Sequence, residues 1–327
     1  MHTNSTIIPI ASGKGGVGKT MLTANLAMAL AKAGHQTVAV DLDLGGSNLH
    51  THLGIPNKHP GIGDFLKGRH VDFDDLLLPT ETKNLRFIPG DGKTPFMANI
   101  PFEQRKLLIG EIKKIKARYV LLDLGAGSNF NTLNFFGLAN RSIIISTFET
   151  AAIMNFLMFL RNFMFRLLTS AFRKNPEVFA VLTNLFKQSI RDRPLTVAMV
   201  MDKMATLDPA LTAETQRKLQ FYRPRIVFNM GETPDDLKIC QSIDKSLQAY
   251  LALQPEFFGF IFHDASVRKA ARNNKPLLSV APDCLAARGI TALAESIITN
   301  WDHYQEDSAA TLLTLTRDNF DKWQPVA

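Results

Sequence analysis

A run of eight residues near the start of the chain has the types and spacing needed to bind phosphate. It matches the pattern G-x-x-x-x-G-K-[S/T], in which glycines let successive backbone N–H groups turn toward a phosphate chain. In this pattern the lysine, Lys19, reaches the β- and γ-phosphates, and the hydroxyl of Thr20 binds Mg²⁺ directly. The residues that would surround the phosphates are Gly13, Lys14, Gly15, Gly16, Val17, Gly18, Lys19 and Thr20.

The flanking residues predict a strand before this loop and a helix after it. Residues 7–11 form a short apolar run that ends at the glycines, and residues 20–33 are rich in alanine, leucine and methionine. Gly34 lies where a helix C-cap is expected. This order would place the phosphates at a helix N-terminus, where free N–H groups and the helix dipole favour anions. The loop is therefore predicted to bind a nucleotide.

A second lysine in the loop, Lys14, narrows the assignment. The run KGGVGKT resembles the deviant Walker A box of the MinD/ParA family, also called the signature-lysine P-loop ATPases. The resemblance implies ATP and Mg²⁺ as cofactors and a homodimer that closes around ATP. It also implies that Lys14 crosses to the partner's phosphates and neutralises charge there, much as an arginine finger does. Residues 13–21, which end at Met21, would bind the nucleotide, and Lys14 and Lys19 would act in catalysis.

Two carboxylates stand at the end of the next predicted strand, residues 37–43. Asp41 and Asp43 are two positions apart, so both side chains point the same way, as a shared metal and water site requires. Together with Asn48, this segment resembles the D-x-D-x-G…N switch of the same family. The resemblance implies that Asp41 lies near Mg²⁺ through water and that Asp43 orients or activates the attacking water. Asn48 would lie on the mobile switch.

A third acid, Asp123, ends the apolar run of residues 119–123. This run and the glycines after it resemble the Walker B strand and second switch of the family. The resemblance implies that Asp123 holds Mg²⁺ through water and that Gly125 and Gly127 let the switch sense the γ-phosphate. Many relatives have proline where this chain has Gly125, so we expect a looser loop here.

The base of the nucleotide is assigned to a later asparagine. Asn229 ends the apolar run of residues 226–229, and the resemblance implies that it reads the adenine edge. Residues 257–270 resemble the late strand and base-binding loop of the family. Relatives usually carry a proline just before the acidic residue of that loop, whereas this chain has Phe262 and His263. We expect His263 to be a loop side chain rather than a catalyst.

The alternation of strands and helical stretches predicts an α/β fold with a doubly wound, mainly parallel sheet, as in P-loop NTPases of the MinD/ParA type. We expect one ATPase domain over residues 1–300 and a helical tail over 301–327. Residues 155–224 do not match the family and are expected to form a basic, mostly helical insertion. Residues 151–228 contain 12 Lys/Arg and 5 Asp/Glu, a balance of +7 that equals the net charge of the whole chain.

A local basic excess indicates an anionic partner, either nucleic acid or an anionic membrane surface. Residues 155–168 are apolar almost all round, which is typical of a core or dimer-interface helix, of a membrane-interface helix, or of one in a partner's groove. Arginines interrupt them before the roughly 20 apolar residues that a bilayer requires. The tail, with balanced charges, is expected to pack on its own domain rather than target a membrane.

The remaining composition favours a cytoplasmic protein, and the family resemblance allows a peripheral position at the inner membrane. The N-terminus shows no secretory signal pattern, and Cys240 and Cys284 are too far apart in sequence to predict a metal cluster or a disulfide framework. A MinD/FlhG-like switch that positions or recruits a partner at the inner membrane, with a protein activator of hydrolysis, is the preferred function. A ParA-like DNA-partitioning ATPase is the alternative. A metal-cluster carrier, which needs suitably placed cysteines, and a tyrosine kinase with a tyrosine-rich tail are remote.

Overall fold

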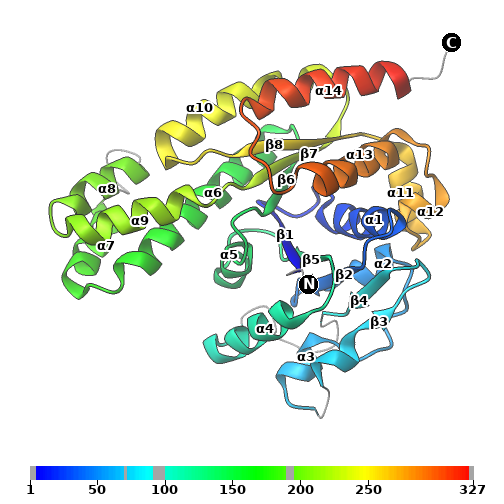
Figure 1. Cartoon of the computed structure of the whole chain (residues 1–327), viewed down its shortest axis with the longest axis horizontal. Coiled ribbons are helices and arrows are strands. Elements are labelled where there is room, and N and C mark those ends of the chain that lie inside the picture. Colours follow the sequence, from blue (N-terminus) through cyan, green and yellow to red (C-terminus); the bar gives the residue numbers. More distant parts are fainter. Residues whose placement is uncertain (1–4, 70–71, 91–99, 189–194, 324–327) are drawn as a thin grey trace.

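The computed structural model describes residues 5–69, 72–90, 100–188 and 195–323. An eight-stranded sheet forms its centre (Figure 1), with strand order β3-β4-β2-β5-β1-β6-β7-β8. All neighbouring strands are parallel except β3 and β4. The strands are β1 (Thr6–Ser12), β2 (Thr37–Leu42), β3 (Leu78–Pro79), β4 (Leu85–Ile88), β5 (Tyr119–Leu124), β6 (Ile143–Ser146), β7 (Arg225–Gly231) and β8 (Glu256–Phe262). The predicted α/β fold with a mainly parallel sheet is confirmed.

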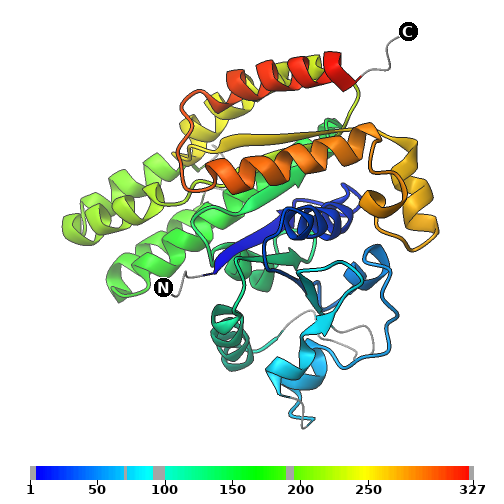
Figure 2. The ribbon, with the colours of Figure 1, turned by 45° about the vertical axis from the view of Figure 1, so that its right-hand side comes forward.

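The central strands are apolar along nearly their whole length because helices cover both faces of the sheet. Every residue of β2 and of β5 is buried, as expected for strands in the middle of a parallel sheet. One face is covered by α1 and α13, which lie side by side (Figure 2), and by the shorter helices α11 and α12. The other face is covered by α4, α5, α6, α10 and α14.

The helices that cover these faces have the following bounds: α1 (Lys19–Lys32), α2 (Leu49–His52), α3 (Ile62–Leu66), α4 (Phe102–Lys114), α5 (Phe130–Phe136), α6 (Thr150–Phe172), α10 (Cys240–Leu251), α11 (Ala265–Arg272), α12 (Leu277–Val280), α13 (Leu285–Asn300) and α14 (Ser308–Trp323). The described residues also include two 3₁₀ helices, η1 (Phe73–Leu76) between α3 and β3 and η2 (Pro234–Ile239) between β7 and α10. Sheet and helices together place the carboxyl ends of the parallel strands at one edge, where α/β proteins bind ligands.

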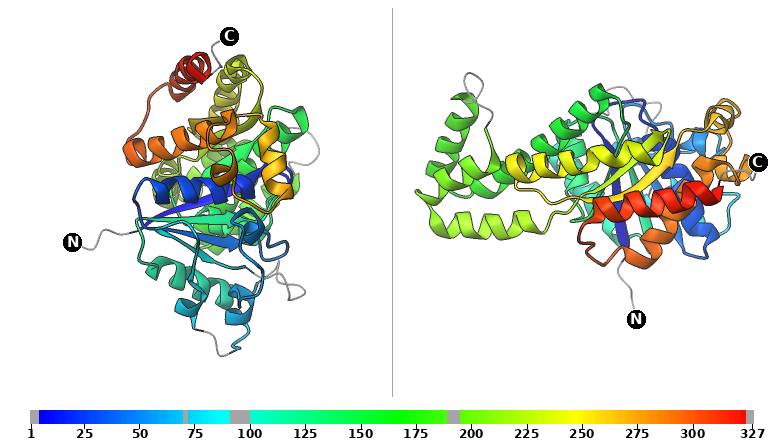
Figure 3. Two further views of the ribbon diagram at one scale, coloured as in Figure 1. Left: turned by 90° about the vertical axis from the view of Figure 1, so that its right-hand side faces the viewer. Right: turned by 90° about the horizontal axis from the view of Figure 1, so that it is seen from above.

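Four consecutive helices occupy the described part of the chain between β6 and β7. After α6 come α7 (Pro176–Gln188), α8 (Val197–Ala205) and α9 (Pro209–Gln220), which extend away from the sheet (Figure 3). Among the described residues, α6 is the one helix long and apolar enough to cross a membrane. One side of it is nevertheless buried in the core, where the rings of Phe159 and Phe163 pack edge-on against Phe136. This burial is that of a core helix, the first of the alternatives expected for residues 155–168.

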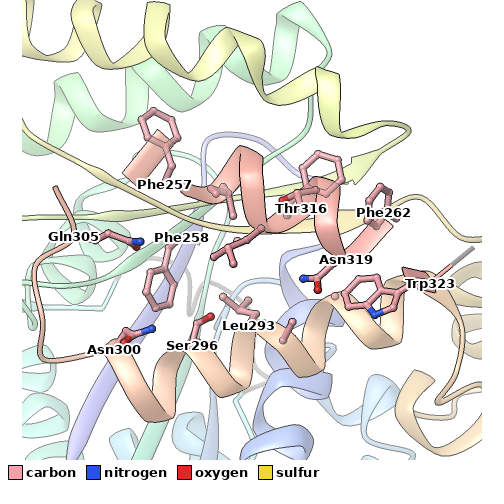
Figure 4. A pocket seen from close by; sticks show the side chains of 16 residues that line it. Phe257, Phe258, Phe262, Leu293, Ser296, Asn300, Gln305, Thr316, Asn319 and Trp323 are labelled. Atoms are coloured by element: carbon pink, nitrogen blue, oxygen red, sulfur yellow. The ribbon is translucent and has the colours of Figure 1, made fainter. Parts of the chain in front are cut away.

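The C-terminal helix α14 packs against the outermost strand, β8. The backbone N–H of Phe257 donates a hydrogen bond of 3.0 Å to Ser308 Oγ, and the ring of Phe320 stacks on Phe262 at 5.0 Å. A cavity of about 90 Å³ remains between β8, α13 and α14, with Leu293 and Trp323 in its lining (Figure 4). Helix α14 therefore packs on the outermost strand, and Ser308 occupies one backbone donor of β8 that could otherwise pair with another chain.

A buried ion pair joins the first residues of β7 and β8. Arg225 Nε and Nη2 donate hydrogen bonds of 3.1 and 3.0 Å to Glu256 Oε2, and both side chains are almost fully excluded from solvent. The guanidinium also lies over the rings of Phe258 and Trp301 and donates to three carbonyls at the end of α13. Burial lowers the pKa of Arg225 to about 10. The pair thus fixes α13 to the sheet.

We expect Arg225→Met to destabilise the protein by about 3–5 kcal/mol, because the Glu256 carboxylate would be left buried without a counter-charge. Adding Glu256→Gln to this variant removes the uncompensated charge and should recover part of the loss. Denaturant unfolding of the two variants and of the natural protein measures both effects. If the double variant were less stable than Arg225→Met, the buried charge would not be the cause.

Candidate active site

The phosphate-binding loop lies between the carboxyl end of β1 and the start of α1. Gly16 and Gly18 have φ angles of +85° and +89°, which residues with side chains rarely adopt. Gly18 is the N-cap of α1, so the free N–H groups of the first helical turn face the loop. A Cβ on Gly15 or Gly16 would meet no atom within 4 Å, which leaves this side of the loop open.

Lys19 and Asp123 form a buried ion pair at the foot of the loop. Lys19, only 6% exposed, donates a hydrogen bond of 2.8 Å to Asp123 Oδ1 and lies 3.4 Å from the hydroxyl of Thr20. Thr23 Oγ1 donates to the same carboxylate oxygen at 2.9 Å. The structure therefore brings together three residues that the sequence assigned to phosphate and metal, and it adds Thr23, which the sequence analysis missed. Its one signal was its position four residues after Lys19, on the same side of the helix.

The two acids expected near the metal are neighbours in the sheet. Asp41 in β2 pairs in register with Asp123 in β5. Asp41 Oδ2 accepts hydrogen bonds from Ser47 Oγ at 2.7 Å and from the Leu49 N–H at 3.0 Å. Burial, and then the negative charge of Asp123, raise the pKa of Asp41 to about 7. Two carboxylates placed so close in a buried site favour a cation between or beside them.

These residues fit a Mg²⁺ ion held together with a nucleotide. Asp123 Oδ2 is buried and has no hydrogen-bond partner among the described residues, so an acceptor remains for a metal-bound water. The same residues contain no group of three or more His, Cys, Asp or Glu side chains that could hold a metal alone. Mg²⁺ commonly takes only one or two carboxylates and completes its shell with waters and phosphate oxygens. Thr20, Asp41 and Asp123 are a donor set of that kind.

The raised pKa of Asp41 predicts that the difference in stability between the natural protein and the Asp41→Asn variant changes with pH. The folded protein holds this proton more tightly than the unfolded chain, so its stabilising contribution is present at acidic pH and is lost as pH rises through about 7. Asparagine carries no such proton. Between about pH 5 and about pH 8 the unfolding free energy of the variant should therefore rise relative to that of the natural protein, by an amount on the order of 2 kcal/mol.

Denaturant unfolding without nucleotide or Mg²⁺ measures this difference at each pH. Titrating groups that do not interact with Asp41 are common to the two proteins and cancel, and any fixed effect of the amide on the hydrogen bonds of Ser47 and Leu49 adds only a constant. A difference that stayed constant with pH would contradict the assigned burial of the Asp41 charge.

Asp43 connects the two expected switches. Its carboxylate lies close to the backbone of both switches. A Cβ placed on Gly46 would lie 3.5 Å from Asp43 Oδ1, and a Cβ placed on Gly125 would lie 3.4 Å from it. Gly127, at φ +78°, donates its N–H to the carbonyl of Ser12 at 2.9 Å and so ties the second switch to the end of β1. Asn48 is exposed and precedes α2. The looser loop expected at Gly125 stays a prediction.

Asn229 lies against the phosphate-binding loop. Its side chain is 2% exposed, and Nδ2 donates a hydrogen bond of 2.8 Å to the carbonyl of Val17. A Cβ on Gly18 would approach that nitrogen to 2.3 Å, so glycine is required there for packing as well as for its φ angle. In this structure the amide of Asn229 supports the loop, and a contact with adenine remains a prediction. Met21 is buried in the first turn of α1.

Lys14 differs from the other charged residues of the loop. It is half-buried, and among the residues that the structure describes it forms no hydrogen bond or ion pair. The neighbouring Gly13 packs tightly on the first turns of α6, where a Cβ would come within 2.4 Å of the backbone carbonyl of Asn155. The sequence analysis missed this contact, which joins the loop directly to the helix that leads to α7, α8 and α9.

The model of the CobQ/CobB/MinD/ParA nucleotide-binding domain matches residues 8–277 of this chain. The chain belongs to this family. The match includes the loop, the three acids and Asn229, and it confirms the family resemblance of the sequence. Pairwise similarity supports it: the antiactivator FleN of Pseudomonas aeruginosa is 24% identical over 89% of this chain and 85% of its own length.

Sequence identity to curated MinD proteins is higher, but it extends over a smaller part of the chain. The septum site-determining protein MinD of Bacillus subtilis is 33% identical over 45% of this chain, and a putative MinD of Tupiella akineta is 33% identical over 46%. The chain spans about half the length of these MinD relatives, 54% and 49% respectively.

Solved structures of the family have the same fold. MinD of Aquifex aeolicus in its complex with MinC matches 92% of this chain and 99% of its own with a TM-score of 0.58 and 19% identity. MinD of Pyrococcus horikoshii complexed with Mg-ADP matches 90% of this chain and 96% of its own with a TM-score of 0.56 and 20% identity. A ParA family ATPase of Chlorobium tepidum matches 89% of this chain and 98% of its own with a TM-score of 0.57 and 16% identity.

Proposed function

We propose that this protein is a Mg²⁺-dependent ATPase whose dimerisation is switched by ATP, and that it positions or recruits a protein partner at the inner membrane surface, as a MinD/FlhG-like regulator does. The observation that carries the proposal is the position of Lys14. It stands on a loop that already has a phosphate lysine, Lys19, and it has no partner within the described part of its own chain. A half-buried lysine in this position suits a phosphate held by a second copy of the protein.

The residues of the site have separate roles in this proposal. Phosphate would attract Lys19 away from Asp123, and so leave that carboxylate free for metal-bound water. Asp43, over the backbone of both switches, would accept a hydrogen bond from the attacking water and orient it. Lys14 of each copy would stabilise the charge that develops on the partner's phosphates. When bound, Mg²⁺ would neutralise charge on the phosphate oxygens.

Co-sedimentation with anionic liposomes tests the membrane role. The protein to use is Asp43→Ala loaded with ATP, because slow hydrolysis should hold it in the dimeric form, and the control is the same protein with ADP at the same salt. Pelleting with ATP and not with ADP supports recruitment to a membrane. Failure of a trapped dimer, verified by light scattering, to pellet would remove the membrane from the proposal while leaving the ATPase switch in place.

A ParA-like role in DNA binding is the second candidate, and the charge of α6 to α9 favours it. Lys174 and Lys218 are both paired with Glu214, but Arg173, Lys187 and Lys203 form no ion pair with a described residue. Binding to DNA of random sequence should then require ATP and fall steeply as salt is raised. If the dimer binds DNA in an ATP-dependent, salt-sensitive way and does not pellet with liposomes, a role in DNA partitioning is favoured over membrane positioning.

A further inference from the structure

Two arginines and two phenylalanines form a cluster beside the second switch, where α4, α5 and α6 meet. Its members are Phe102, Arg105, Phe130 and Arg166. The guanidinium of Arg166 lies 4.2 Å from the centre of the Phe130 ring, and that of Arg105 lies 4.8 Å from it. Arg105 also lies over Phe102, at 5.5 Å. Both rings face solvent, with Phe102 63% and Phe130 51% exposed.

Among the described residues, no acidic side chain forms an ion pair with the two arginines of the cluster. Arg105 donates to Asn131 at 2.9 Å and Arg166 to Asn134 at 3.2 Å, both neutral amides. Arg105 is only 6% exposed, and Arg166 Nε is buried with no hydrogen-bond partner among those residues. Burial lowers the pKa of both guanidinium groups, and the charges of Arg105 and Arg173 add to the effect on Arg166. Arginines held together in this way attract carboxylates strongly.

From this arrangement we infer that the cluster is the docking surface for an acidic segment of a partner protein, one that presents Asp or Glu to Arg105 and Arg166 and an apolar side chain to Phe102 and Phe130. Charge complementarity supplies the orientation, and the two exposed rings supply apolar area to bury. Aromatic residues and arginine together are the composition that protein interfaces concentrate at their energetic centre.

Nucleic acid fits this surface less well than a protein segment does. A base would have to stack on an exposed ring, but guanidinium groups already lie over Phe102 and Phe130. A short carboxylate-bearing segment needs only the two arginines and the ring edges beside them.

The docking surface is connected to the catalytic switches by hydrogen bonds. Asn129 Oδ1 caps α5 by accepting from the Thr132 N–H at 2.9 Å, and Thr132 Oγ1 lies 3.4 Å from the carbonyl of Gly125. Asn162 of α6 donates to Ser128 Oγ at 2.7 Å. Gly125 in turn lies beside the carboxylate of Asp43. A partner that moved Phe130 would therefore shift the backbone next to the residue assigned to the attacking water.

Helix α6 provides a second connection, to the phosphate-binding loop. Its Asn155 packs on Gly13, and three turns later Arg166 belongs to the cluster. The partner would thus sense nucleotide through α5 and α6 together. This coupling step rests on the proposed ATPase switch, whereas the docking surface itself does not.

Fluorescence anisotropy with a labelled peptide tests the docking surface. The probe alternates glutamates with leucine and phenylalanine, and a matched probe has glutamine in place of every glutamate. We expect the natural protein to bind the acidic probe at least about tenfold more tightly than the neutral one. Phe130→Ala and Arg166→Gln should each weaken that binding about tenfold, while Lys113→Gln, at the exposed far end of α4, should leave it unchanged.

Two results would overturn the inference. One is equal binding of the acidic and neutral probes, or none of either, and the other is unchanged affinity in both cluster variants, provided that circular dichroism shows them folded. Loss of single-stranded DNA binding in Arg166→Gln with unchanged peptide binding would assign the cluster to nucleic acid instead. ATP turnover of the natural protein without peptide is measured in parallel. Its absence would refute the proposed function alone, because peptide binding needs no hydrolysis.

Discussion

Replacing Lys14 with alanine is expected to lower ATP turnover about a thousandfold while leaving ATP binding to the monomer measurable. Cationic groups that reach the transferred phosphate from a second molecule contribute effects of this size, and Lys14 has no structural bond to lose within the described part of its own chain. Turnover should also depend on protein concentration in the natural protein, because in the proposed mechanism two copies must meet. Steady-state phosphate release at several protein concentrations measures turnover. Calorimetry with a slowly hydrolysed ATP analogue measures ATP binding to the variant.

Lys19 and Lys113 are informative comparisons for this variant. Lys19→Ala removes the partner of the buried Asp123 carboxylate, so it should lose both nucleotide binding and stability, whereas Lys14→Ala should unfold like the natural protein. Lys113→Ala, at the exposed end of α4, should be neutral in every measurement. Unchanged turnover in Lys14→Ala would remove the mechanism in which each copy completes the other's site.

The parts of the site that could be predicted from the sequence are those whose geometry is local. The glycines, Lys19 and Thr20 are consecutive, and their backbone conformation follows from residue type and from the helix that begins at Lys19. Asp41 and Asp123 lie far apart in the chain, but each is the last residue but one of a buried strand, and parallel strands bring their carboxyl ends to one edge. The topology of a parallel sheet was therefore enough to predict that these two acids lie close together.

What could not be predicted depends on contacts between elements whose spacing the sequence does not encode. The approach of α6 to Gly13 is set by how β6 and α6 pack, and nothing in the residues near Asn155 indicates it. Arg105, Phe130 and Arg166 come from three helices that are separated in sequence, so no motif links them. The direction in which α7, α8 and α9 leave the sheet is likewise a matter of tertiary packing (Figure 3).

The Asp43→Ala variant should bind ATP but hydrolyse it about a hundredfold or more slowly, and it should therefore accumulate as a dimer. The carboxylate lies over the backbone of both switches and makes no ion pair with a described residue, so its removal should take away the group proposed to orient water and leave the fold intact. Asp41, in contrast, accepts hydrogen bonds that hold the first switch, so its loss would change the loop itself.

Size-exclusion chromatography with light scattering separates the possible outcomes of this experiment. With ATP the variant should elute as a dimer and the natural protein as a mixture that returns to monomer as ATP is consumed; with ADP both should be monomeric. Asp74→Ala, in the exposed part of η1, is the matched acidic control and should behave like the natural protein. Turnover at the natural rate by Asp43→Ala would assign the orientation of water to another group, and a dimer that also formed with ADP would separate association from the γ-phosphate altogether.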